Sequence, residues 1–98
     1  MRYQIILAPE AVEDLNALRA ATKSIVKDAL QRHLGDEPTK VSKSRIKRLR
    51  GLSRPQYRLR VDEIRVFYDV TETDVEVLVI VAKSEAEQWL ERFGTKGE

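Results

Sequence analysis

The sequence predicts an α+β fold: an N-terminal strand, a helical hairpin, a three-stranded antiparallel meander that completes a twisted four-stranded sheet, and a short C-terminal helix. Two observations support this prediction. Apolar residues recur at helical spacing in residues 9–34, and they alternate with polar residues in residues 57–70. A chain of 98 residues, 42% of them hydrophobic, is expected to form a single domain over residues 1–94, with a flexible tail at 95–98.

The N-terminal third is predicted to be a strand followed by two helices. Residues 3–7 are typical of a strand that enters the core, and Pro9 suits the first turn of a helix. A second helix is expected from about Thr22, with Gly35 just beyond its end. The apolar stripes of the two helices are Val12, Leu15 and Leu18, and then Ile25, Val26, Ala29, Leu30, His33 and Leu34.

The remaining elements follow a basic segment, residues 40–54, which we expect to be a mostly extended and partly ordered connection. Residues 57–61 and 64–70 alternate as two strands, and residues 75–81 are apolar on both faces, as in a central strand. Ser84 and Glu87 have the spacing of a capping box, which predicts a helix over residues 84–94. The aromatic residues of that helix are expected to pack on the sheet, although they could instead dock a partner; they are Trp89 and Phe93.

Positive charge is concentrated in one part of the chain. Between Lys40 and Val61 there are nine Lys or Arg residues and no Asp or Glu, although the formal net charge of the whole chain is only +2. If Asp62-Glu63 joins the two strands, an antiparallel ladder places Arg60 opposite Arg65. Like charges opposite each other destabilise a sheet. The arginines therefore favour a polyanionic partner, of which nucleic acid is the commonest.

The candidate site is the cluster of Arg58, Arg60 and Arg65, with Phe67 beside it because the same ladder sets Phe67 opposite Arg58. Guanidinium groups can hold phosphates bidentately, and an aromatic ring can stack on a base. A second interpretation is a docking surface for an acidic or amphipathic protein segment. A third is that nearby carboxylates neutralise the arginines; these carboxylates are Asp62, Glu63 and Asp69.

Other kinds of site are excluded or not predicted. The chain has no cysteine, which excludes disulfides, thiolate metal sites and a cysteine nucleophile. His33 is the only histidine and is expected to be structural, and no glycine-rich phosphate loop precedes a helix. We expect no metal and no cofactor. The N-terminal apolar stretch is far shorter than the ~20 residues of a membrane span and lacks a signal-peptide pattern, so no membrane contact and a cytoplasmic location are expected.

Four segments resemble the RelE/ParE superfamily of bacterial and archaeal toxins. They are Lys47–Leu52, Tyr57–Val61, Ile64–Val70 and Val81–Ala86. The predicted order of elements agrees with that superfamily as well. The resemblance implies a toxin of a type II toxin–antitoxin system, which a cognate antitoxin would bind and with which it could form a hetero-oligomer.

The RelE-like branch, which we favour, implies a ribosome-dependent mRNA interferase that acts in the ribosomal A site. In that reaction the ribose 2′-hydroxyl attacks the adjacent phosphate and leaves a 2′,3′-cyclic phosphate and a 5′-hydroxyl. The matching positions imply Arg58, Arg60, Arg65 and Lys83 as catalytic residues. The basic segment predicts RNA-binding residues at Lys43, Arg45, Lys47, Arg48 and Arg50, and the strand over residues 64–70 adds Phe67.

The sequence departs from the RelE pattern at two positions. Ser84 stands where an arginine is expected, and Leu90 stands where a tyrosine is expected. Because a guanidinium stays protonated, the arginines are expected to stabilise the phosphorane, while Lys83, Lys47 or a ribosomal group assists proton transfer. The departures favour one alternative, a ParE-like, non-enzymatic inhibitor of DNA gyrase. A second alternative is an inactive antitoxin-binding member.

Overall fold

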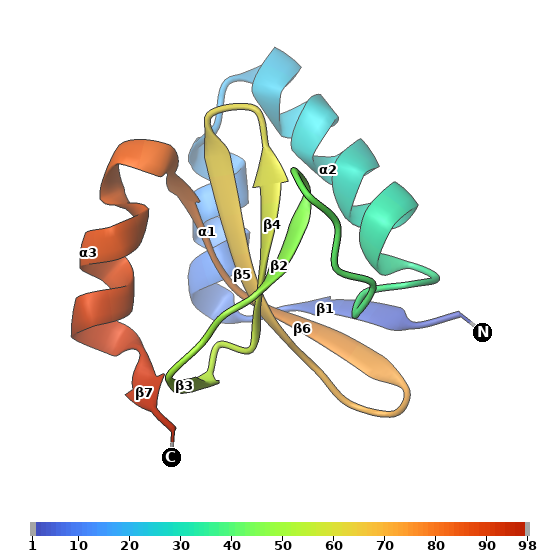
Figure 1. Ribbon diagram of the computed structural model, residues 1–98. Coiled ribbons are helices and arrows are strands. Elements are labelled where there is room, and N and C mark those ends of the chain that lie inside the picture. Colours follow the sequence, from blue (N-terminus) through green and yellow to red (C-terminus); the bar gives the residue numbers. More distant parts are fainter. Residues whose placement is uncertain (1, 98) are drawn as a thin grey trace.

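The computed structural model describes residues 2–97 and shows a sheet flanked by helices (Figure 1). Met1 and Glu98, the ends of the predicted domain and tail, lie outside this range. The elements are β1 (Gln4–Leu7), α1 (Pro9–Ala17), α2 (Ala20–Leu34), β2 (Ile46–Arg48), β3 (Leu52–Arg54), β4 (Tyr57–Val61), β5 (Ile64–Val70), β6 (Asp74–Ala82), α3 (Lys83–Phe93) and β7 (Thr95–Lys96).

The sheet is mixed, and its strand order is β1-β6-β5-β4-β2. β1 is parallel to β6, and the other neighbours are antiparallel. The predicted α+β fold, with its N-terminal strand, two helices, meander and C-terminal helix, is confirmed. The sheet has five strands instead of the expected four, because β2 pairs with β4.

β2 lies in the segment expected to be a mostly extended and partly ordered connection. Ile46, which is 5% exposed, pairs with Leu59 and supplies the one buried side chain of β2. The outer side of this edge strand is closed by Ser42, whose N–H donates to the Ile46 carbonyl (2.9 Å) and whose Oγ accepts from the Ile46 N–H (3.2 Å). A three-residue strand with a single apolar side chain has no period that a sequence can reveal.

The β4–β5 hairpin has the predicted register. Arg60 lies opposite Arg65 and Arg58 lies opposite Phe67, as the turn at Asp62-Glu63 requires. Asp62 has φ 52°, a left-handed conformation that aspartate tolerates better than most residues. The like-charged pair is therefore a real feature of the sheet.

The core lies between the α1–α2 hairpin and one face of the sheet. Its centre is Tyr68, which is fully buried, stacks on Tyr57 at 5.6 Å between ring centroids, and donates from its hydroxyl to the Pro38 carbonyl at 2.6 Å. Burial, with Tyr57 adding to it, raises the pKa of Tyr68, so the hydroxyl is a neutral donor. The other buried members of this core are Ala11, Val26, Ala29, Leu30, Leu34, Ile46, Leu59, Val61, Val66, Val75, Val77 and Ile80.

Replacing Tyr68 with phenylalanine should lower the free energy of unfolding by about 1 kcal/mol, because the buried Pro38 carbonyl loses its donor. Urea denaturation at neutral pH measures this difference. Tyr57→Phe is the matched control, since Tyr57 is only half-buried. An equal effect of the two substitutions would contradict the role given to the hydrogen bond.

α3 begins one residue earlier than predicted. Its first residue is Lys83, its N-cap is Ala82, and no side chain caps it, so the predicted capping box at Ser84 is wrong. The reason is that the β4–β5 turn supplies the hydrogen-bond acceptor at the start of the helix: the Lys83 N–H donates to the Glu63 carbonyl at 2.7 Å. α3 lies on the sheet face opposite the core (Figure 1).

The aromatic side of α3 covers the sheet only in part. Trp89 stacks on Phe67 at 5.6 Å between ring centroids, as expected, whereas Phe93 is 57% exposed. Beyond α3, two residues of the predicted flexible tail form β7, in which Thr95 lies opposite Arg54 of β3. The C-terminal end of the chain is thus tied to the segment that leads into β4.

Candidate functional site

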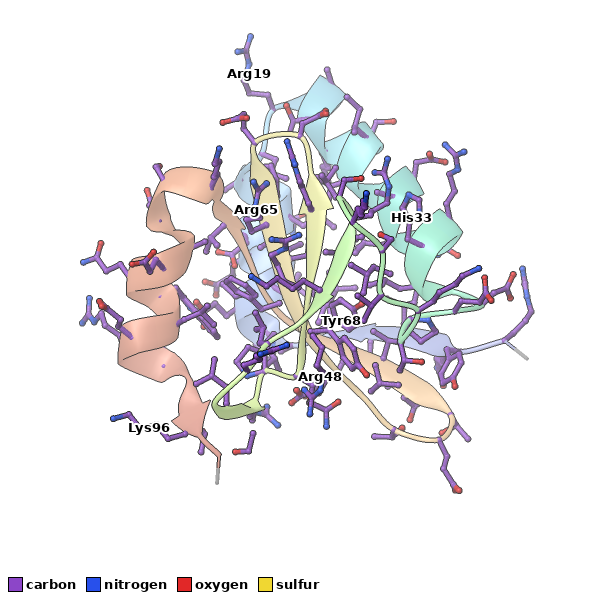
Figure 2. The ribbon with its side chains drawn as sticks, viewed as in Figure 1. Arg19, His33, Arg48, Arg65, Tyr68 and Lys96 are labelled. Carbon is purple, nitrogen blue, oxygen red and sulfur yellow. The ribbon has the colours of Figure 1, made fainter. Side chains whose placement is uncertain are left out.

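Four basic side chains share the sheet face that carries α3. Lys47 of β2 lies opposite Arg58 of β4, and Arg60 of β4 lies opposite Arg65 of β5. Since side chains alternate between the faces of a sheet, all four fall on the face of Phe67. Figure 2 shows Arg65 on the side of β5 that faces α3. We call Lys47, Arg58, Arg60 and Arg65 the basic cluster.

Among the residues that the structure describes, no carboxylate lies within ion-pair distance of the basic cluster. Within residues 2–97, the ion pairs shorter than 4.0 Å involve other cations only, namely Arg32, Lys40 and Arg54. Asp69, one of the carboxylates that might have neutralised the arginines, pairs with Arg54. The interpretation in which carboxylates neutralise these arginines therefore lacks support, and the cluster keeps its positive charge.

Arg58 is a partly buried cation close to two others of the cluster. It is half-buried, and its buried Nε has no hydrogen-bond partner among residues 2–97. Burial lowers the pKa of Arg58, and the charges of Arg65 and Arg60 lower it further. An anion placed against the Arg58 guanidinium would balance the repulsion, because an unpaired buried charge is costly.

Arg65 is brought into the cluster but is also fastened to the backbone. It is 7% exposed, and its Nη1 donates to the carbonyls of Asp62 (2.8 Å) and Ile64 (3.0 Å). These bonds hold its guanidinium against the β4–β5 turn. Arg65 thus braces the hairpin as well as adding charge beside Arg60.

The base-stacking role predicted for Phe67 does not fit the structure. Phe67 is 1% exposed and Trp89 covers its ring. The side chain that the sequence places next to the arginines is instead a packing residue beneath α3. The aromatic side chains at this face that a ligand can reach are instead those of α3, namely Trp89, which is partly exposed, and Phe93, which is 57% exposed. The sequence indicated both as residues that pack on the sheet or dock a partner, but the spacing of α3 does not show which of the two rings covers Phe67.

The other predicted site residues are dispersed around the cluster. Lys83 is exposed at the start of α3, next to the β4–β5 turn. Arg48 is engaged within the fold: its guanidinium lies 5.1 Å from the centroid of the Tyr57 ring and donates to the Gln56 carbonyl at 2.7 Å. Lys43, Arg45 and Arg50 are exposed side chains of the segments that flank β2.

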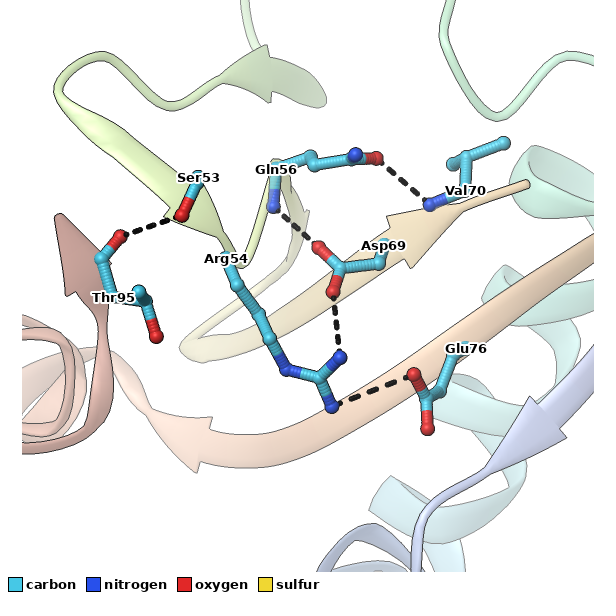
Figure 3. A network of polar contacts seen from close by, with 7 residues as sticks. All are labelled: Ser53, Arg54, Gln56, Asp69, Val70, Glu76 and Thr95. Atoms are coloured by element: carbon cyan, nitrogen blue, oxygen red, sulfur yellow. Dashed lines mark hydrogen bonds and ion pairs between the residues drawn. The ribbon is translucent and has the colours of Figure 1, made fainter. Parts of the chain in front are cut away.

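A polar network that the sequence did not reveal fixes the segment that leads into β4 (Figure 3). Arg54 pairs with Asp69 at 3.4 Å and with Glu76 at 3.5 Å. The Gln56 N–H donates to Asp69 at 2.8 Å, and the Gln56 side-chain carbonyl accepts from the Val70 N–H at 2.9 Å. These contacts position the start of β4 and therefore Arg58. They join residues far apart in sequence, so no local pattern indicates them.

Asp69→Asn should change how stability depends on pH. Burial raises the pKa of Asp69, although the Gln56 hydrogen bond and Arg54 oppose the shift. The folded state thus holds the proton more tightly than the unfolded chain does. The resulting stabilisation is fully present below the ordinary pKa of 3.8 and is lost as pH rises through the raised value.

Urea denaturation between mildly acidic and neutral pH tests this dependence. The free energy of unfolding of the wild type, relative to Asp69→Asn, should fall as pH rises through this range. Glu72→Gln, a change at an exposed carboxylate, serves as the control, and its free energy of unfolding should depend on pH as that of the wild type does. The opposite slope would show that the Arg54 pair outweighs burial.

The geometry suits a phosphodiester better than a metal or a cofactor. Guanidinium groups can bind phosphate oxygens and stabilise negative charge that develops on them, but they do not remove protons. Within residues 2–97, no three His, Asp or Glu side chains lie together so as to hold a metal ion. Of the helices in that range, none is long and apolar enough to cross a membrane.

Comparison with known families identifies the chain. Residues 5–89 match the family model described as the ParE toxin of the type II toxin–antitoxin system parDE. The chain belongs to this family and is a type II toxin of the RelE/ParE superfamily. No curated protein matches it.

Solved structures of related toxins share the fold of this toxin. It is similar to free Escherichia coli RelE (20% identity, TM-score 0.68), covering 95% of this chain and 99% of that one. It is also similar to the RelBE2 toxin–antitoxin complex from Mycobacterium tuberculosis (23% identity, TM-score 0.66), covering 84% of this chain and 99% of that one. A third similar structure is the RelE–RelB complex from Pyrococcus horikoshii (24% identity, TM-score 0.63), covering 85% of this chain and 97% of that one. Homologues of this toxin have thus been crystallised in toxin–antitoxin complexes.

Proposed function

We propose that the toxin is a ribosome-dependent mRNA interferase whose basic cluster binds and helps to cleave mRNA in the ribosomal A site. The observation that supports this proposal is the unbalanced charge of the cluster, in which the buried Arg58 Nε lacks an acceptor among residues 2–97. A phosphodiester bound by the guanidinium groups supplies the countercharge. Because ribosomes are cytoplasmic, the toxin acts in the cytoplasm.

The proposed reaction is attack of a ribose 2′-hydroxyl on the adjacent phosphate, which breaks the bond to the 5′ oxygen of the next nucleotide. Arg58, Arg60 and Arg65 stabilise the pentavalent phosphorane. The 2′-hydroxyl proton leaves and the 5′ oxygen gains a proton, which requires a group other than an arginine. The group that transfers these protons is Lys83 next to the β4–β5 turn, Lys47 within the cluster, or a group of the ribosome.

A cognate antitoxin is the second proposed partner. Relatives of this toxin form toxin–antitoxin complexes, and a polypeptide rich in acidic side chains would match the basic cluster. Covering the cluster would exclude mRNA from it. The antitoxin and RNA should therefore compete for the wild type in a binding assay.

A second candidate function, inhibition of DNA gyrase without catalysis, is favoured by two observations. The matching family model is that of ParE, and the chain has Ser84 and Leu90 at positions where RelE-like enzymes carry an arginine and a tyrosine. In this alternative the basic cluster would contact gyrase or its DNA.

Purified toxin with ribosomes programmed with a defined mRNA separates the two candidates. The interferase proposal expects fragments that end in a 2′,3′-cyclic phosphate, strongly reduced by Arg58→Ala and unaffected by the exposed α2 substitution Lys27→Ala. A supercoiling assay with DNA gyrase runs in parallel. Intact mRNA together with inhibited gyrase would overturn the interferase proposal in favour of the alternative.

A further inference from the structure

A groove leads away from the basic cluster around the free edge of the sheet. β2 is the last strand of the sheet, and Arg45 immediately precedes it. Arg45 lines three adjoining depressions of about 260, 170 and 420 Å³. The first of them also contains Arg60, and the other two reach His33 on α2. We call this path, lined by Arg60, Arg45, Ser44, His33 and Arg32, the edge groove.

The backbone joins the start of the edge groove to the basic cluster. The Arg60 N–H donates to the Arg45 carbonyl at 2.8 Å, so the two arginines are neighbours across β2 and β4. Figure 2 shows His33 at α2, on the other side of the sheet from Arg65. A ligand held by Arg60 can therefore continue past Arg45 toward α2 without crossing the core.

The electrostatics of the groove favour an anion near Arg45 and His33. Four carboxylates also line it, but Asp28 pairs with Arg32 at 3.6 Å and Glu37 pairs with Lys40 at 3.8 Å. Asp36 lies at the far end beside Glu37, and Asp62 lies at the β4–β5 turn. Arg45 has no ion pair shorter than 4.0 Å among residues 2–97.

His33 reports the sign of the field inside the groove. Burial lowers its pKa, the charges of Arg45 and Arg32 lower it further, and the nearby Asp28 only partly opposes them. Arg45 and Arg32 are therefore the cations that act on the imidazole. Ser44 at the groove entrance and Ser42 farther along it carry hydroxyl groups, which suit phosphate oxygens.

We propose that the edge groove binds the backbone of the same RNA strand whose scissile phosphate lies at the basic cluster, with Arg45 as the main phosphate contact. This inference rests on the proposed function and extends it. It predicts a binding site several nucleotides long, which bends around β2 and ends against α2. A dinucleotide would fill only the basic cluster.

The single histidine makes the proposal testable by NMR. A 2′-O-methyl RNA of about eight nucleotides, a length within the usual range for single-stranded sites, is titrated into the wild type. It should shift the ring resonances of His33 and raise its pKa, because a nearby phosphate favours the imidazolium. A 2′-O-methyl dinucleotide should leave those resonances in place.

Variants test the contact to Arg45 itself. Arg45→Ala should reduce the affinity for the long RNA more than that for the dinucleotide, and should lower the slope of log affinity against log salt by about 0.7. Lys27→Ala removes an exposed cation of α2 outside the groove. It should change neither the ratio of the affinities for the two RNAs nor the slope of log affinity against log salt. Arg45 is exposed, so the variant should remain folded, which its urea denaturation curve verifies.

The outcomes separate this inference from the proposed function. Long RNA that binds in a manner dependent on Arg58 but leaves His33 unmoved overturns the edge groove and keeps the basic cluster as an RNA site. Equal losses for both RNAs in Arg45→Ala also overturn it. Absence of any RNA binding that depends on Arg58 overturns the groove and the proposed function together.

Discussion

Replacing Arg58 with alanine is expected to weaken binding of single-stranded RNA by roughly 10-fold to 100-fold, since a hydrogen-bonded contact to a charged group contributes about 1.5–3 kcal/mol. Arg58 lies at the centre of the basic cluster, between Lys47 and the Arg60–Arg65 pair, and its buried Nε has no hydrogen-bond partner within the part of the chain that the structure describes. Fluorescence anisotropy with a labelled 2′-O-methyl RNA measures the loss.

The same substitution is expected to raise the free energy of unfolding. Burial and the charges of Arg65 and Arg60 both disfavour the Arg58 charge in the folded protein. Removing the charge relieves this cost, as is common when a binding residue is replaced. Weaker RNA binding with greater stability is a combination that loss of structure cannot produce.

Two further variants serve as controls for Arg58. Arg58→Lys retains a positive charge but not the bidentate fork, so its affinity should fall between those of the wild type and Arg58→Ala. Lys27→Ala should bind as the wild type does. An Arg58→Ala variant with the affinity of the wild type would show that the cluster does not bind RNA through Arg58.

Phe67→Ala is expected to have the largest effect on stability, about 3–5 kcal/mol, because it empties a buried aromatic site. Phe67 is 1% exposed and supports the Trp89 ring of α3. Small domains have only about 5–15 kcal/mol of stability, so the variant should unfold at markedly lower urea concentration. Loss of α3 packing should accompany the change and appear as altered Trp89 fluorescence.

Phe67→Leu distinguishes a packing role from a stacking role. Leucine keeps much of the buried apolar volume but cannot stack on a base. The folded variant should therefore bind RNA as the wild type does. If it folds normally and yet loses most of its RNA affinity, the assignment of Phe67 to packing is wrong.

The sequence was sufficient to predict the part of the site that lies on one hairpin. Alternation and the turn at Asp62-Glu63 determine that Arg60 lies opposite Arg65 and Arg58 lies opposite Phe67, and the structure has this register. Such cross-strand neighbours follow from local counting alone. The charge of the basic segment was equally plain, because it depends only on composition.

Features that depend on tertiary contacts could not be predicted. β2 exists because Ile46 fits the core beside Leu59, not because its three residues alternate. The start of α3 is set by the Glu63 carbonyl instead of Ser84. Phe67 is covered because α3 folds back across the sheet. The alternation of residues in the strand that contains Phe67 does not indicate that a helix covers this face.

Long-range polar contacts were also beyond the sequence. Arg54 belongs by composition to the basic segment, but it pairs with Asp69 and Glu76 on two later strands. Arg48, another predicted RNA contact, lies over Tyr57 and bonds to Gln56. Counting charges therefore overstates how many basic side chains are available to a ligand.

Mapping of RNA 5′ ends after induction of the toxin in growing cells tests the proposed activity most directly. If the basic cluster cleaves mRNA on the ribosome, new 5′-hydroxyl ends should appear within translated messages, at positions fixed relative to the reading frame. They should disappear when Arg58→Ala is induced instead. Growth arrest by the wild type with messages left intact would contradict the proposal.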